Sequence, residues 1–255
     1  MKAFAAFFGK EIMELKRSGK LMFLTILFTL FGIMNPAVAK LTPWLFEILS
    51  DSMEASGITV NQITVTAAQS WEQFFKNIPI ALIVVIVMFA GIFSREYAQN
   101  TLVPLLTKGL SKSSVTLAKT LIAQLVWAGG FWLCFGITYV YSAYYWDNSI
   151  MEYLGTAAAF WYLNGVWLIA VMMLFAVLSD TNLPALLGTG AMYLLSVLLG
   201  FLPRCKEYVP TYLTSGASIC TSAAEVRDYI PSLVIALCIT TVCTILSVFL
   251  GRKKA

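Results

Sequence analysis

Residue types that usually carry out chemistry are scarce in this chain of 255 residues. There is no histidine, so the commonest metal ligand and proton shuttle is missing from the sequence. The five cysteines include no CxxC pair and no cluster with the spacing of metal ligands. The phosphate-binding loop GxxxxGKS or GxxxxGKT is also absent. We therefore expect no cofactor on this chain.

The cysteines divide into two groups by their surroundings. Cys134, Cys238 and Cys243 lie within apolar stretches, where a thiol behaves as a small apolar side chain. Cys205 and Cys220 lie together in one more polar segment. In an oxidising compartment these two could form a disulfide, and two free thiols are an equally supported alternative.

Apolar residues dominate the composition. Hydrophobic residues make up 59% of the chain, charged residues make up 12%, and the mean hydropathy is +0.81. Six windows lack Asp, Glu, Lys and Arg, and each is near the roughly 20 residues that cross a bilayer. They are residues 21–39, 78–94, 120–146, 153–179, 181–203 and 229–251. Because lipid offers backbone amides no partners, and no barrel-like alternation occurs, we expect an all-α polytopic membrane protein with six transmembrane helices in one domain, 1–255.

The basic residues predict the orientation of this bundle. If both termini are cytoplasmic, twelve of the 17 Lys and Arg residues fall in cytoplasmic segments, as the positive-inside rule favours. Their position beside anionic lipid also accounts for the net charge of +4. We therefore expect a lipid bilayer as partner and no nucleic acid.

Residues 1–20 predict a helix that lies in the membrane interface. Phe4, Phe7, Phe8, Ile12 and Leu15 recur at helical spacing, with charged residues between them. A basic flank that only orients the first span is the alternative. A cleaved signal peptide is disfavoured, because the first apolar run is longer than a typical signal core.

Two outer segments differ in character. Residues 40–77 are mildly acidic and are expected to be partly helical, with five aromatic residues near the lipid headgroups: Trp44, Phe46, Trp71, Phe74 and Phe75. Residues 204–228 contain Pro210, Gly216 and many small hydroxyl residues. They could return into the membrane as short helices where protein buries the backbone.

The cytoplasmic loop 95–119 has the most informative polar pattern. It begins with Arg95 and Glu96, and Leu102, Leu105 and Leu106 give it one apolar face. The pattern predicts a short amphipathic helix, a turn and the start of the next span, and so a docking surface for a cytoplasmic partner. An ordinary basic loop that obeys the positive-inside rule is the alternative.

The uncharged windows also limit the mechanism. Ion-coupled carriers and proton pumps keep ionisable residues at mid-membrane, where each costs at least about 2.5 to 3.5 kcal/mol. All six windows lack such residues. If the chain moves a solute uphill, we therefore expect the energy to come from another subunit. An intramembrane enzyme is disfavoured, because no span contains a histidine, an aspartate or a metal-binding cluster.

One stretch of residues carries a family resemblance. It consists of Gly91 to Glu96, Thr101 and Leu102, Leu105 to Thr107, Leu110 to Lys112, and Lys119. This stretch resembles the exit of the second span in type-2 ABC exporter permeases. The interfacial first helix, the six-span layout and the two outer segments agree with that family. Asn100 departs from it where a glycine commonly precedes the threonine, and Gly109 where a proline is frequent.

The resemblance implies a permease subunit that works with a separate ABC ATPase, which would bind ATP and Mg. It implies that the helix after span two contacts the ATPase through Glu96, Tyr97, Thr101, Leu102, Leu105, Leu106 and Lys108. A second copy or a related permease would complete the unit in the bacterial plasma membrane. Polar residues in the spans are candidates for a pathway at the dimer interface, or alternatively for hydrogen bonds between helices: Asn35, Gln124, Asn164 and Thr189.

The expected function is therefore outward transport by alternating access, with the chemistry of ATP hydrolysis on the partner. The aromatic, uncharged spans favour an amphipathic or hydrophobic substrate, with a mild preference for a peptide. The alternative is a membrane anchor or sensor that recruits a cytoplasmic partner through the same loop and transports nothing.

Overall fold

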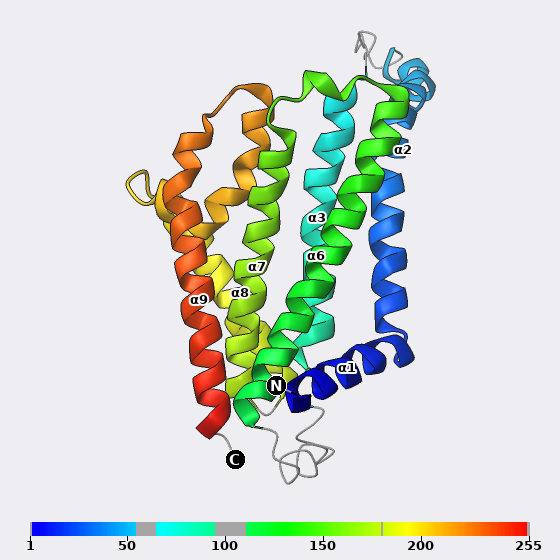
Figure 1. Ribbon diagram of the computed structural model, residues 1–255. Coiled ribbons are helices and arrows are strands. Elements are labelled where there is room, and N and C mark those ends of the chain that lie inside the picture. Colours follow the sequence, from blue (N-terminus) through cyan, green and yellow to red (C-terminus); the bar gives the residue numbers. More distant parts are fainter. Residues whose placement is uncertain (1, 55–64, 95–110, 180, 254–255) are drawn as a thin grey trace.

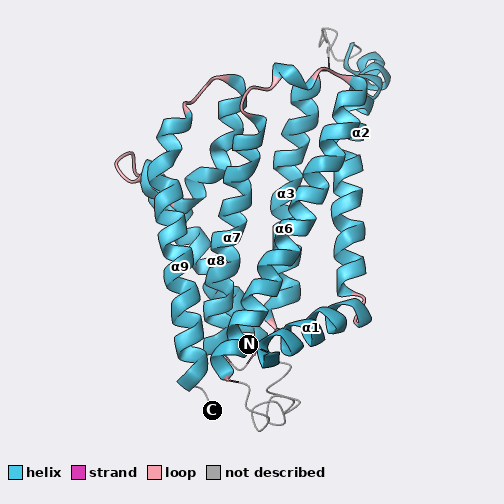
Figure 2. Ribbon diagram, in the orientation of Figure 1, coloured by secondary structure: helices cyan, strands magenta, loops and turns pink. Residues whose placement is uncertain are grey.

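A computed structural model describes residues 2–54, 65–94, 111–179 and 181–253, and in these ranges the chain forms helices and loops but no strand (Figures 1 and 2). Six helices in the described part are long and apolar enough to cross a membrane. The prediction of an all-α protein with six such helices is therefore confirmed.

The long helices stand side by side as a bundle (Figure 1). They are α2 (Lys20–Glu54), α3 (Ala67–Ala90), α6 (Lys112–Tyr145), α7 (Leu154–Leu178), α8 (Asn182–Gly200) and α9 (Ile230–Lys253). Helix α1 (Lys2–Arg17) lies across one end of the bundle, and α9 finishes at the same end (Figure 1). We call this end the α1 end. Four 3-10 helices complete the described chain: η1 (Asn148–Ile150), η2 (Lys206–Tyr208), η3 (Pro210–Thr221) and η4 (Val226–Tyr229).

Three helices extend beyond the apolar windows that predicted them. Helix α2 continues through Pro36 and Pro43, and α3 begins at Ala67, so segment 40–77 is helical at both of its ends. Helix α6 begins within the predicted loop 95–119. The extension of α2 is held to α6 by Lys40, whose ammonium group lies 4.0 Å from the ring centroid of Tyr145.

The aromatic residues at the start of α3 belong to the core. Trp71 and Phe74 are fully buried, and Phe75 is nearly so. The Trp71 ring packs against Phe135 with the centroids 5.2 Å apart, and Phe74 packs against Phe131 at 5.8 Å. These three rings therefore pack in the protein instead of facing the headgroups, because α3 packs against α6 here, whereas Trp44 is exposed and the side chain of Phe46 lies outside the described part.

Helix α7 forms the centre of the bundle. It contacts α3, α6, α8, α9 and η3, and most of its side chains are buried. A helix that is apolar on all sides is expected in such a position. Helix α6 comes close at Gly165 of α7, where a Cβ would overlap the indole ring of Trp127.

Helices α8 and α9 turn much of their surface outward. Leu187 and Leu194 on α8 and Val234 and Ile245 on α9 are all at least half exposed. A continuous apolar surface of this kind is normally covered by lipid or by another protein.

Helix η3 is covered by protein, although a 3-10 helix of 12 residues is unusually long. In Figure 1 the chain turns after α8 partway along the bundle, and η3 runs on to the end opposite α1. The hydroxyl groups of Ser196 on α8 and Thr211 share a hydrogen bond of 2.9 Å. Ser232 on α9 donates to the backbone carbonyl of Val209 at 2.6 Å. Neighbouring helices therefore satisfy the polar groups where η3 begins.

Candidate functional site

The structure describes the chain on both sides of the predicted coupling residues. On one side the described chain ends at Ser94, shortly after α3. On the other side Ser111 caps α6, because its hydroxyl accepts a hydrogen bond from the backbone amide of Ser114 at 3.2 Å. The coupling residues themselves lie outside the described part: Glu96, Tyr97, Thr101, Leu102, Leu105, Leu106 and Lys108.

A buried ion pair beside these two ends joins α1 to α6. Lys119 Nζ donates to the carboxylate of Glu11 at 2.9 Å, and the two side chains are 2% and 7% exposed. Charges this far from water need a close partner, because removing each one from water costs several kcal/mol. The pair therefore fixes the point at which α1 crosses α6.

Aromatic rings surround the same ammonium group. Lys119 Nζ lies 5.9 Å from the ring centroid of Phe7 on α1, and also 5.9 Å from that of Phe93 just after α3. Both rings are buried. We call Phe7, Glu11, Phe93 and Lys119 the ion-pair cluster. It brings together α1, the chain that leaves α3 and the first turns of α6.

The sequence did not predict that these four residues contact one another. Lys119 resembles the other basic residues that flank membrane spans, and Glu11 stands in a helix with several charges. The available clue was the position of Glu11 one turn after Phe7, on the apolar face of α1. A carboxylate on an apolar helix face predicts a buried cation beside it.

Two further charges of α1, Lys10 and Glu14, pair on its exposed side. Lys10 Nζ lies 2.9 Å from the carboxylate of Glu14 and 3.0 Å from that of Glu11. The hydrogen bond from Lys10 lowers the pKa of Glu14. Partial burial works to lower the pKa of Lys10, but its hydrogen bonds to Glu14 and Glu11 outweigh that effect and raise the pKa above its usual value. Both carboxylates of α1 therefore have a lysine partner.

A second contact ties the chain after α3 to the start of α8. The Ser94 hydroxyl donates to the side-chain oxygen of Asn182. A Cβ at Gly91 would overlap the Asn182 side chain, so this close approach requires glycine. A displacement of Ser94 would therefore act on α8.

The four candidate pathway residues fall into two groups, and the first group joins helices. Asn35 on α2 accepts a hydrogen bond from Asn77 on α3 at 2.8 Å and donates one to Thr138 on α6 at 3.0 Å. Gln124 on α6 donates to the backbone carbonyl of Val166 on α7 at 2.9 Å. Asn35 and Gln124 are therefore used in helix packing, the alternative that the sequence left open.

Asn164 and Thr189 lie together in a groove of about 330 Å³ between α3, α7 and α8, which we call the α3–α8 groove. Its lining is mostly apolar. Two buried polar atoms in this lining, Asn164 Oδ1 and Trp161 Nε1, have no hydrogen-bond partner among the described residues. The Thr189 hydroxyl donates to the carbonyl of Ala185 at 2.6 Å and can still accept. The groove thus suits an apolar ligand, because the side chains of Trp161, Asn164 and Thr189 are at most 6% exposed and offer it little polar surface.

Cys205 and Cys220 are free thiols in the structure, and Cys220 is buried. Burial raises the pKa of the Cys220 thiol to about 11, so this group is protonated at neutral pH and reacts slowly. The structure therefore holds the pair in the unbonded form, one of the two states that the sequence allows.

No protein-family model matches the chain, and no curated protein matches it significantly. Function is therefore inferred from the geometry of the chain itself. The two features that bear on it are the ion-pair cluster, beside both ends of segment 95–110, and the α3–α8 groove.

Proposed function

We propose that the chain is the membrane-spanning permease subunit of an ATP-driven exporter of the type-2 ABC class. The observation that supports this most is the ion-pair cluster, because it joins α1, α3 and α6 where segment 95–110 leaves and rejoins the bundle. In this proposal the α1 end faces the cytoplasm, and an ATPase subunit binds segment 95–110.

A permease driven by a separate motor needs a stiff joint at the place where the motor pushes. A buried ion pair provides one, because breaking it by removing a partner costs about 3–5 kcal/mol. A load on segment 95–110 would move α1, α3 and α6 together, and would reach α8 through Ser94 and Asn182. Since α3 and α8 form walls of the α3–α8 groove, this movement would change its width.

The α3–α8 groove supports the substrate part of the proposal. Its apolar walls fit a hydrophobic or amphipathic molecule, such as an apolar peptide. The exposed apolar surface of α8 suits a second permease copy. Two copies that meet there would place the groove beside the interface between them.

The first test is to purify the chain from its native membrane in mild detergent and to identify the proteins that accompany it. A stoichiometric ATPase whose hydrolysis rate responds to the permease supports the proposal. A chain that purifies alone, or with a partner that is not an ATPase, favours the anchor or sensor instead.

Glu96→Ala is expected to weaken the coupling of ATP hydrolysis to transport, because it removes the acidic group proposed to contact the ATPase. We expect the amount transported per ATP hydrolysed to fall about 5- to 150-fold, which corresponds to the usual size of a coupling free energy between two sites. The measurement is transport and hydrolysis by the whole complex in proteoliposomes. Glu72→Ala, on the exposed surface of α3, is the matched control and should leave the ratio unchanged. Unchanged coupling in Glu96→Ala would rule out its docking role.

A further inference from the structure

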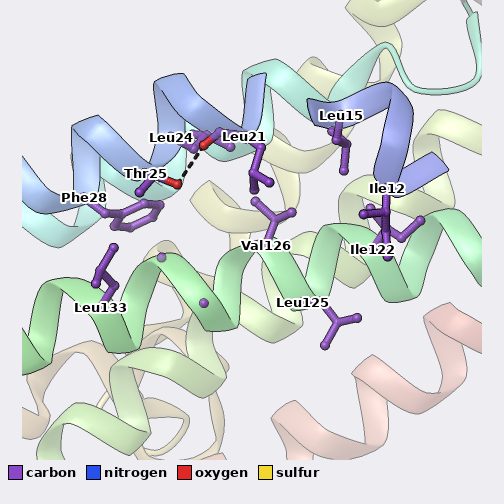
Figure 3. Close-up of a pocket in the computed structure, with 12 residues that line it drawn as sticks. Ile12, Leu15, Leu21, Leu24, Thr25, Phe28, Ile122, Leu125, Val126 and Leu133 are labelled. Atoms are coloured by element: carbon purple, nitrogen blue, oxygen red, sulfur yellow. Dashed lines mark hydrogen bonds between the residues drawn. The ribbon is translucent and has the colours of Figure 1, made fainter. Parts of the chain in front are cut away.

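A second groove opens on the surface of the bundle where α1, α2 and α6 meet (Figure 3). We call it the α1–α6 groove; it has a volume of about 380 Å³ and a mostly apolar lining. Leu21 and Val126 face one another across it (Figure 3). Thr25 contributes a hydroxyl, but that hydroxyl already donates to the backbone carbonyl of Leu21 at 2.8 Å. The groove therefore suits an apolar chain.

Two glycines of α6 line this groove, and the space beside one of them, Gly129, is open. A Cβ at Gly129 would meet no atom within 4 Å. A Cβ at Gly130 would overlap the ring of Phe28, which lies near Leu133 at the end of the groove away from α1 (Figure 3). Gly129 is thus an exposed part of the lining that another molecule can contact.

The length of the α1–α6 groove matches one leaflet of a bilayer. It runs along α6 from Ile122, beside α1, to Leu133. The rise between these residues in an α-helix is about 16 Å, close to half of the roughly 30 Å hydrocarbon core. If the bundle spans a membrane, a lipid acyl chain from the leaflet at the α1 end would lie along the whole groove.

Basic side chains stand where the headgroup of that lipid would lie. Lys16 and Arg17 form the last turn of α1 and are exposed, directly after Leu15 at the mouth of the groove. The carboxylates of Glu11 and Glu14 both contact Lys10, at 3.0 and 2.9 Å. The mouth therefore carries positive charge, which attracts an anionic headgroup.

We propose that the α1–α6 groove is a binding site for one anionic phospholipid. Its acyl chain lies over Gly129, and its phosphate contacts Lys16 and Arg17. The proposed lipid site requires only that the six helices span a bilayer. It does not depend on whether the protein transports a substrate. It would fix α1 at the membrane surface with lipid as well as with the ion pair of Glu11 and Lys119.

The test is to titrate the purified full-length protein with phosphatidylglycerol and with phosphatidylcholine, and to count bound lipid by native mass spectrometry. The wild type should bind one phosphatidylglycerol in preference to phosphatidylcholine. The double variant Lys16→Gln/Arg17→Gln should bind phosphatidylglycerol about 30-fold more weakly. Each basic group near an anionic headgroup strengthens binding about fivefold, and the double variant removes two of them. Gly129→Leu fills the groove and should lose the tight site for both lipids.

Two variants serve as controls. At Gly136, elsewhere on α6, a Cβ would also meet no atom within 4 Å, so Gly136→Leu adds the same bulk outside the groove. Lys76→Gln removes an exposed charge from α3. Both should bind phosphatidylglycerol as the wild type does. Unchanged binding in Gly129→Leu would overturn the proposal. So would a loss of dimers in Gly129→Leu without a change in bound lipid, since the groove would then hold a second copy of the chain.

Discussion

Glu11 and Lys119 carry opposite charges in a place where neither meets water, so their interaction can be measured directly. Glu11→Gln is expected to lower the free energy of unfolding by about 3–5 kcal/mol, because it leaves the buried charge of Lys119 without its partner, and Lys119→Gln should cost less because Glu11 keeps Lys10 at 3.0 Å. The double variant should lose less than the sum of the two, with a coupling energy of about 0.5–3 kcal/mol. Unfolding in SDS, followed by circular dichroism, provides the free energies.

The pair of Glu72 and Lys76 on α3 is the matched control for this cycle. Its atoms are 2.6 Å apart, but both side chains are more than half exposed. Because water screens such a pair, the same cycle on it should give only about 0.3–0.5 kcal/mol. Equal coupling in the two pairs would mean that burial does not strengthen the contact between Glu11 and Lys119.

The two buried asparagines of the spans should respond differently to the same substitution. Asn35→Leu is expected to lower the free energy of unfolding by about 1–3 kcal/mol, because it breaks hydrogen bonds to both Asn77 and Thr138. Asn164→Leu removes an oxygen that has no partner among the described residues, so its stability should stay within about 1 kcal/mol of the wild type. The same SDS titration compares them. A larger loss in Asn164→Leu would show that Asn164 is a packing residue.

At the scale of the helices, the approach of α6 to α7 depends on Gly165. Gly165→Ala is expected to lower the free energy of unfolding by about 1–3 kcal/mol, because the added methyl group overlaps the Trp127 ring. Trp127 also donates to the backbone carbonyl of Tyr162 at 3.0 Å, which holds the ring in place. Gly136→Ala on α6, where the methyl group enters open space, should not destabilise the protein. Equal effects at the two glycines would mean that the ring moves aside freely.

The existence of the long helices could be predicted from the sequence, because each carries an apolar stretch of membrane length. The extents of α2, α3 and α6 could not, because the apolar windows stop at the first charged residue. Lys119 and Glu72 show why a helix continues past such residues. Lys119 is neutralised by Glu11 from another helix, and Glu72 pairs with Lys76 one turn away. Only the folded chain shows which charges have a partner.

The candidate site could be predicted only in part, for a similar reason. The polar residues of the spans are visible in the sequence, but Asn164 lies on α7, which is apolar on every side. No face of such a helix is marked as inward or outward by its pattern. The sequence therefore could not tell that Asn164 shares a groove with Thr189, while Asn35 bonds to Asn77 and Thr138.

At the scale of the whole molecule, orientation is the property to test. In a variant without native cysteines, Ser18→Cys at the α1 end should react with a membrane-impermeant maleimide only after the cells are opened. Ser222→Cys, just after η3, should react in intact cells, because the distribution of Lys and Arg predicts that the α1 end is cytoplasmic. Both serines are exposed, so their reactivity reports the side of the membrane. The reverse labelling pattern would show that the α1 end lies outside the cell, where a cytoplasmic ATPase could not bind segment 95–110.

The beginning of η3 has a consequence for how the protein is made. The backbone amide of Thr211 donates to Ser196 on α8 at 3.3 Å, and the carbonyl of Val209 accepts from Ser232 on α9. Since α9 follows η3 in the chain, the second of these bonds cannot form until α9 has been synthesised. Helix η3 therefore gains its full set of hydrogen-bond partners only after α9 has been synthesised. In a nascent chain that still lacks α9, the backbone carbonyl of Val209 is therefore without its partner Ser232.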